Sequence, residues 1–167
     1  MTAAPHLTVA RRIPHFFGHT TDDETRPPDT RAEMLARIRA KRCRILVVDD
    51  DVIFKDSVVI KLTARYRALV ETSKAGRNAV LNAMTAQPPF DLILLDIRLL
   101  GPMNGIDVYD EIRAAGIQTP ILLMSAYYSD DVRDKAALRK ELIHHKESQS
   151  LYTEIEFILL RCLGGDA

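Results

Sequence analysis

Four apolar segments of the chain end in side chains that could take part in a reaction. The segment "RILVV" runs into three consecutive aspartates, and three later segments end in an aspartate, a serine and a lysine. These side chains belong to Asp49, Asp50, Asp51, Asp96, Ser125 and Lys146. Because crowded carboxylates repel one another, they stay ionised only where a cation compensates their charge. The spacing therefore indicates a cation site beside a reactive group.

Phosphoryl transfer is the chemistry that suits this set of groups. Mg²⁺ prefers oxygen ligands and keeps some of its waters, which leaves room for a phosphoryl group. An aspartate can attack that group and form a covalent aspartyl phosphate. A lysine and a metal ion would compensate the charge on the phosphoryl oxygens, and a hydroxyl could donate one more hydrogen bond.

The elements that must position these groups follow from the hydrophobic pattern. Short apolar segments alternate with segments of helical spacing, and the continuous apolar ones are typical of strands buried on both faces. We expect strands over 44–48, 68–73, 90–97, 119–126 and 141–146, and helices over 52–67, 75–87, 105–116, 129–140 and 150–163. This alternation predicts an α/β fold with a doubly wound, five-stranded parallel sheet. Ligands bind such sheets beyond the carboxyl ends of the strands, so the groups above should meet at one edge.

Four motifs in this order resemble the receiver domain of two-component response regulators. They are "ILVVDDD", "DLILLDIRL…G", "PILLMSA" and a lysine about twenty residues later. The resemblance covers the region 44–164 and implies a flavodoxin-like sheet with strand order 2-1-3-4-5. It also implies Mg²⁺ as the cofactor.

The resemblance assigns a phosphoacceptor and a metal site. Asp96 matches the aspartate that accepts the phosphoryl group. Asp49 and Asp50 match the acidic pair that holds Mg²⁺ together with Asp96, and Asp50 is the more direct ligand. The backbone carbonyl of Arg98 matches the group that completes the metal site. Asp51 matches no role in the family, and we expect it to cap the following helix.

The switch residues match the family only in part. Ser125 matches the switch hydroxyl, and Lys146 matches the lysine that contacts the phosphoryl group. The family usually has an aromatic residue three positions before this lysine and a proline after it, whereas here Ile143 and a glutamate stand there. A trans bond after the lysine is therefore expected. We expect the response to phosphorylation to centre instead on Tyr127 and Tyr128.

Three functions are compatible with these residues. The first is a single-domain response regulator that accepts phosphate from a histidine kinase or a phosphotransfer protein. It would act through a downstream protein, a relay or a phosphate sink, because the 167 residues hold no output domain. The second is a pseudo-receiver that binds partners without being phosphorylated. The third is a haloacid dehalogenase-like phosphatase, for which "DDDVI" offers a D-x-D start with Asp49 as nucleophile but no further acidic pair. Enzymatic activity beyond self-phosphorylation from a donor and autodephosphorylation is not expected.

The expected organisation has four parts. They are a flexible tail (1–29), a basic amphipathic helix or linker (30–43), the receiver domain (44–164) and a short tail (165–167). Thr30 and Glu33 have the spacing of a capping box at the start of the helix. Between Arg31 and Arg44 six residues are basic and one is acidic. This helix could lead into the domain or form a homodimer, and its short apolar stripe without aromatic residues does not favour nucleic acid.

Composition narrows the class of protein further. Hydrophobic residues make up 47% of the chain, which is enough for one core, and the 23 basic and 23 acidic residues balance, so no polyanionic partner is indicated. Cys43 and Cys162 lie far apart without a secretory signal and are expected to be free thiols in a reducing compartment. No segment approaches the roughly 18 to 20 apolar residues of a membrane span. We therefore expect a cytoplasmic protein with no membrane contact.

Overall fold

The computed structural model describes residues 30–127, 129–141 and 143–163. The tail expected over 1–29, the short tail over 165–167 and Tyr128 lie outside the described residues. Among the described residues, no helix is long and apolar enough to cross a membrane.

A five-stranded parallel sheet forms the centre of the molecule, and its strand order is β2-β1-β3-β4-β5. The strands are β1 (Arg44–Val48), β2 (Leu69–Ser73), β3 (Leu92–Asp96), β4 (Ile121–Ser125) and β5 (Ile143–His145). This confirms the doubly wound, flavodoxin-like sheet. The chain winds outward from β1 in both directions, which is why two neighbouring strands at the centre can share one site at their carboxyl ends.

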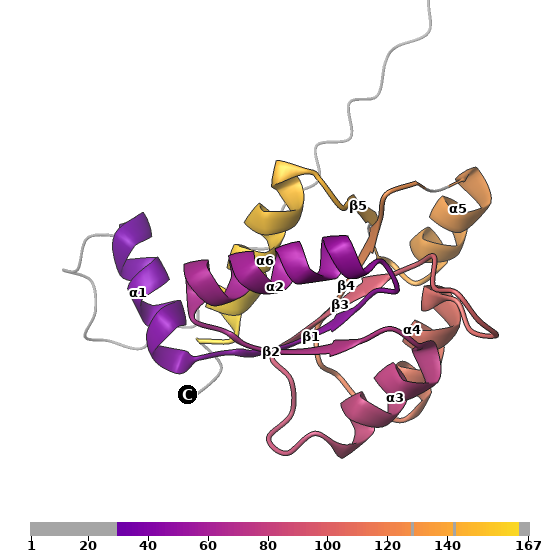
Figure 1. The fold of residues 1–167 in the computed structure, drawn as a ribbon, viewed down its shortest axis with the longest axis horizontal. Helices are drawn as coiled ribbons and strands as arrows, with labels where there is room; N and C mark the ends of the chain where they lie inside the picture. Colours follow the sequence, from indigo (N-terminus) through magenta and orange to yellow (C-terminus); the bar gives the residue numbers. More distant parts are fainter. Residues whose placement is uncertain (1–29, 128, 142, 164–167) are drawn as a thin grey trace, which may run out of the picture.

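Six helices pack around the sheet in the part of the chain that the structure describes (Figure 1). They are α1 (Arg31–Lys41), α2 (Val52–Tyr66), α3 (Gly76–Thr85), α4 (Gly105–Ala114), α5 (Asp130–Leu138) and α6 (Gln149–Arg161). Helices α2 and α6 lie over one face and α3 and α4 over the other, so the sheet is buried on both sides.

Each central strand supplies both cores, because successive side chains of a strand point to opposite faces. The core under α2 and α6 receives Ile45, Val47, Leu92 and Leu94. The core under α3 and α4 receives Leu46, Val48, Ile93 and Leu95. All eight side chains are fully buried, which explains the unbroken apolar runs in the sequence.

Helix α1 is part of the packed structure. Its capping box is present: the backbone amide of Glu33 donates to the Thr30 hydroxyl at 3.3 Å, and the Thr30 amide donates to Glu33 Oε2 at 2.6 Å. Ile38 is completely buried in the core under α2 and α6. The helix therefore packs on the domain through its one buried apolar residue.

The start of α4 lies against the backbone at the end of β3. The amide of Gly105 donates to the carbonyl oxygen of Ile97 at 2.9 Å. A Cβ atom at Gly105 would lie 2.1 Å from the carbonyl oxygen of Asp96, a distance that no side chain can adopt. Glycine is thus required here, and the close approach holds the end of β3 in place.

Candidate functional site

Three carboxylates meet at the carboxyl edge of the sheet. Strands β1 and β3 are neighbours, and Val48 lies opposite Leu95. The next residues after these, Asp49 and Asp96, therefore lie side by side. Oxygen atoms of Asp49, Asp50 and Asp96 all lie within 4.8 Å of one another. The convergence expected at this edge is therefore present for all three acids.

Lys146 lies between two of these carboxylates. Its Nζ is 2.7 Å from Asp49 Oδ2 and 2.9 Å from Asp96 Oδ2, and its side chain is only 7% exposed. The backbone amide of Lys146 donates to the carbonyl oxygen of Ser125 at 3.1 Å, which ties the residue to the end of β4. Burial acts to lower the pKa of Lys146, but its close contacts with Asp49 and Asp96 and the charge attraction of both aspartates outweigh it and raise the pKa. The side chain therefore stays an ammonium ion.

Asp49 has an oxygen that the protein leaves incompletely satisfied. The side chain is fully buried, and Oδ1 accepts from the backbone amide of Asp51 at 2.9 Å. Oδ2 contacts Lys146 as an ion pair but has no aligned hydrogen bond to any of the described residues. Burial raises the pKa of the Asp49 carboxyl against the opposing effect of Lys146. A further cation at this oxygen would favour the ionised form.

These observations fit a magnesium ion. The donors are carboxylate oxygens, the ligand type that Mg²⁺ prefers, and one buried oxygen lacks an aligned donor. Asp50 is only half-buried, so water has access to the same place. Asp49, Asp50 and Asp96 are the residues that could hold the ion.

Asp96 has both oxygens engaged within the protein. Oδ2 contacts Lys146, and Oδ1 accepts from the backbone amide of Arg98 at 3.1 Å. The loop after β3 therefore folds back over this carboxylate. The role expected for the carbonyl group of Arg98 stays a prediction.

Ser125 lies at the same edge of the sheet as the acids, and its hydroxyl is engaged within its own turn. The side chain is completely buried, and Oγ donates to the carbonyl oxygen of Tyr127 at 2.7 Å. The backbone amide of Tyr127 in turn donates a hydrogen bond of 3.3 Å to Oγ of Ser125. The hydroxyl would have to leave this turn to reach a group on Asp96. The bond between Lys146 and Glu147 is trans, as expected.

Two neighbours of the acids were not found from the sequence. Lys55 Nζ donates to the carbonyl oxygen of Asp49 at 3.2 Å, and the ring of Phe54 lies 4.8 Å from Nζ of Lys146. Both belong to the first turn of α2, which Asp51 caps by accepting from the amide of Phe54 at 3.1 Å. In the sequence, the contact of Lys55 is indicated only by its place among the apolar residues at the start of this helix.

Comparisons with known proteins bear on the family and the fold of this chain. The family described as the response regulator receiver domain matches residues 45–142. A probable transcriptional regulatory protein of Picosynechococcus is 34% identical over 96 residues, which cover 55% of this chain and 38% of the relative. The probable transcriptional regulatory protein TcrX of Mycobacterium tuberculosis is 33% identical over 94 residues, which cover 56% of this chain and 37% of the relative. The chain thus matches less than two-fifths of the length of either regulator.

Solved structures show the same fold. The receiver domain of a putative LuxO repressor protein from Vibrio parahaemolyticus has a TM-score of 0.65 at 23% identity, over 75% of this chain and 95% of that one. The receiver domain of the histidine kinase CKI1 from Arabidopsis thaliana, complexed with Mg²⁺ and BeF₃⁻, has a TM-score of 0.63 at 23% identity, again over 75% and 95%.

Proposed function

Because the chain belongs to the response regulator receiver domain family, we propose that it accepts a phosphoryl group on Asp96 and holds Mg²⁺ beside it. The observation that carries this proposal is the position of Lys146, whose ammonium group contacts Asp49 and Asp96 in a buried site. The half-buried Asp50 adds a third carboxylate within 4.8 Å. The CKI1 receiver, which has the same fold, is complexed with Mg²⁺ and BeF₃⁻, a mimic of a phosphoryl group.

The proposed reaction transfers phosphate from a phosphohistidine. A carboxylate oxygen of Asp96 attacks phosphorus, the P–N bond of the donor breaks, and the imidazole leaves and takes up a proton. The Asp96–Lys146 contact of 2.9 Å opens in this step, and the ammonium group moves to a phosphoryl oxygen. Bound Mg²⁺ would compensate charge on the other phosphoryl oxygens. The backbone amide of Arg98 keeps the carboxylate oriented.

The donor and the output are parts of the same proposal. We propose a histidine kinase or a phosphotransfer protein as the donor, in the cytoplasm, and a protein contact, a relay step or a phosphate sink as the output. The family match favours this function over the dehalogenase-like alternative. Incubation with a panel of purified phosphorylated donors, followed over time, would identify the one that transfers fastest.

A direct test uses a small phosphodonor. The chain is incubated with acetyl phosphate and Mg²⁺, and its intact mass is measured. We expect one phosphoryl adduct on the wild type, none on Asp96→Asn, and the normal adduct on Asp56→Asn, which changes an exposed aspartate of α2. A wild type that takes up neither phosphate nor BeF₃⁻ would overturn the proposal.

A pseudo-receiver is the second candidate, and one observation favours it. Among the described residues, the Ser125 hydroxyl donates to the carbonyl oxygen of Tyr127 and bonds to no carboxylate. Ile143 and Glu147 also replace the residues usual in the family. Failure of the mass experiment would support this function, with partners bound by an unphosphorylated domain.

A further inference from the structure

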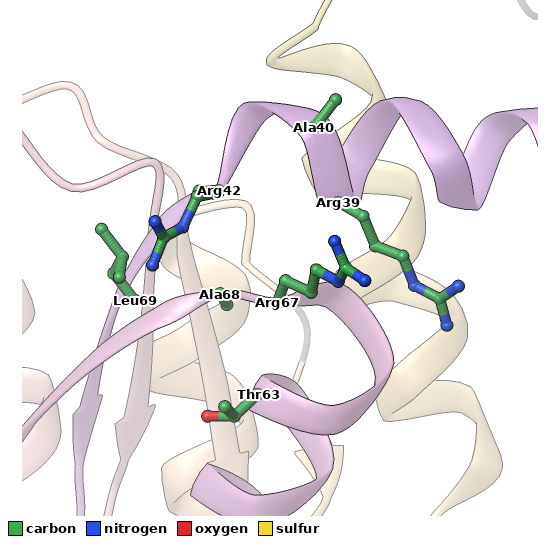
Figure 2. Close-up of a pocket in the computed structure, with 7 residues that line it drawn as sticks. All are labelled: Arg39, Ala40, Arg42, Thr63, Arg67, Ala68 and Leu69. Carbon is green, nitrogen blue, oxygen red and sulfur yellow. The ribbon is translucent and has the colours of Figure 1, made fainter.

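An open pocket of about 580 Å³ lies where the parallel strands begin, at the edge of the sheet opposite the acids. The last turns of α1 and α2 and the start of β2 form its walls (Figure 2). The lining residues are Arg39, Ala40, Arg42, Thr63, Arg67, Ala68 and Leu69. Three of these are arginines and none is acidic.

The arginines of this pocket differ from the basic residues around it. Ion pairs join Lys41 to Asp91, Arg44 to Glu71 and Arg65 to Glu156. Within the described part of the chain, Arg39, Arg42 and Arg67 have no carboxylate partner. The pocket therefore concentrates positive charge that the carboxylates of the described residues do not compensate.

All three arginines lie at helix C-termini, where the helix dipole favours basic side chains, but only one of them bonds to a terminal carbonyl group. The last carbonyl groups of a helix attract basic side chains. Arg39 follows this rule, because its Nε donates to the carbonyl oxygen of Arg65 at 2.8 Å. Among the described residues, the side chains of Arg42 and Arg67 donate to no carbonyl group. Figure 2 shows Arg42 extended toward Leu69 and Arg67 extended to the other side, toward α1 beside Arg39.

The backbone at these two arginines is strained. Arg42 and Arg67 cap the C-termini of α1 and α2 with φ of 53° and 54°, in the left-handed region. Glycine is the usual residue at such a position, because a Cβ atom there is crowded. Arginine at both caps therefore costs backbone strain that glycine would avoid, and it places two arginine side chains at one pocket.

We propose that this pocket binds a small molecule carrying linked phosphate groups, with Arg42 and Arg67 as its main ligands and Arg39 at the rim. Guanidinium groups form paired hydrogen bonds with phosphate oxygens, and two of them suit a ligand with more than one phosphate. The volume lies in the range of small-molecule sites, and Ala40, Ala68 and Leu69 offer an apolar wall. The pocket is at the opposite edge from Asp96, so the inference does not depend on phosphorylation.

Glycine substitutions at the two arginines test ligand binding without destabilising the fold. The full chain is titrated with inorganic triphosphate by isothermal calorimetry, at low salt without Mg²⁺. Arg42→Gly and Arg67→Gly remove one guanidinium each and relieve backbone strain, so thermal midpoints should stay equal or rise. Each should weaken binding roughly ten- to a hundredfold. Lys140→Gly is the matched control: it removes a positive charge at φ 60° outside the pocket and should bind as the wild type does.

Titrations with other ligands and with other variants distinguish the possible results. Orthophosphate should bind more weakly than triphosphate, and ATP at least as tightly, whereas Asp96→Asn should bind triphosphate normally. The proposal is wrong if triphosphate does not bind the wild type, or if it binds Arg42→Gly/Arg67→Gly as tightly. A further variant replaces Asp22, Asp23 and Glu24 with their amides. If triphosphate binds only to this variant, the proposal is also wrong, because the acidic segment of the chain itself would then be the ligand of the pocket.

Discussion

The ammonium group of Lys146 lies 2.9 Å from Oδ2 of Asp96, although 50 positions separate the two residues in the chain. The same nitrogen lies 2.7 Å from Oδ2 of Asp49. From the sequence, a metal ion was expected to be what holds the acids together. The structure shows that a buried lysine already compensates two of them, so a metal ion at this site would have to compensate only the remaining negative charge.

Removal of this lysine should destabilise the domain strongly. Lys146→Met leaves two buried carboxylates without their cation, and breaking such a buried pair costs about 3 to 5 kcal/mol of unfolding free energy. Urea unfolding measures the loss. Asp49→Asn in the same chain should recover part of it, because one of the uncompensated charges is then gone.

The control for that experiment is Lys135→Met. Lys135 forms an exposed ion pair with Asp131 at 2.9 Å, and such pairs contribute about 0 to 1 kcal/mol. If Lys146→Met unfolds no more easily than Lys135→Met, the buried contact does not stabilise the fold as we describe.

Mg²⁺ binding should depend on Asp50. Asp50→Ala removes one of three carboxylate ligands, so affinity measured by calorimetry should fall at least tenfold. Stability without metal should hold or rise, because repulsion from Asp49 and Asp96 is reduced. A metal-free Asp50→Ala protein that is unfolded would contradict the view that these acids repel one another.

The stability of the domain should depend on pH through Glu156, whose carboxylate joins α6 to α1 and α2. Glu156 of α6 accepts from Arg65 Nε at 2.7 Å, from the Tyr66 hydroxyl at 3.2 Å and from Arg31 at 3.2 Å. Burial acts to raise the pKa of Glu156, but Arg65, Tyr66 and Arg31 outweigh it and lower the pKa below the ordinary 4.5. The folded state thus favours the carboxylate, whose stabilisation is present above pH 4.5 and is lost as the pH falls through the lowered value.

Glu156→Gln should therefore cost about 1 to 2 kcal/mol at pH 7 and progressively less as the pH falls below 4.5. Urea unfolding at several pH values measures the difference. Glu154→Gln, two positions away on the same helix, should show no such trend. An equal cost of Glu156→Gln at every pH would exclude the ionised contact as its cause.

The contact of Gly105 with the end of β3 should not tolerate a methyl group. The Cβ atom of Gly105→Ala would meet backbone atoms of Asp96 and Ile97 at 2.1 and 2.7 Å, and backbone cannot rotate away. We expect a loss of at least about 3 kcal/mol by thermal unfolding. Gly101→Ala is the comparison: its Cβ atom would lie in open space at φ 119°, so only the backbone strain of about 1 to 2 kcal/mol should appear.

Phosphorylation should alter the loop after β4. The Ser125 hydroxyl must release the carbonyl oxygen of Tyr127 to reach a phosphoryl group, which frees the turn they close. Hydrogen exchange with and without BeF₃⁻ and Mg²⁺ should change between residues 125 and 132, with smaller changes near Lys146. Ser125→Ala should abolish the loop response. Changes confined to residues 98–105 would mean that the switch runs through the loop after β3.

Local patterns were enough to predict the sheet and the place of its site. Continuous apolar runs such as "LILLD" can only be buried on both faces, and helical spacing between them requires crossover connections. The order of strands then brings the ends of β1 and β3 together, so Asp49 and Asp96 could be paired from sequence. The capping roles of Thr30 and Asp51 were also predictable, because a cap bonds within its own first turn.

Contacts between distant segments were decided only by the tertiary structure. Neither the bridging position of Lys146 nor the turn that engages the Ser125 hydroxyl follows from spacing, because a side chain's rotamer depends on what packs around it. The same holds for Ile38 and for the pocket of Arg42 and Arg67, which exists only because the ends of α1 and α2 meet at the start of β2. Sequence periodicity determines which face of an element is buried, whereas the partner that covers this face is settled by the packing of whole helices against the sheet.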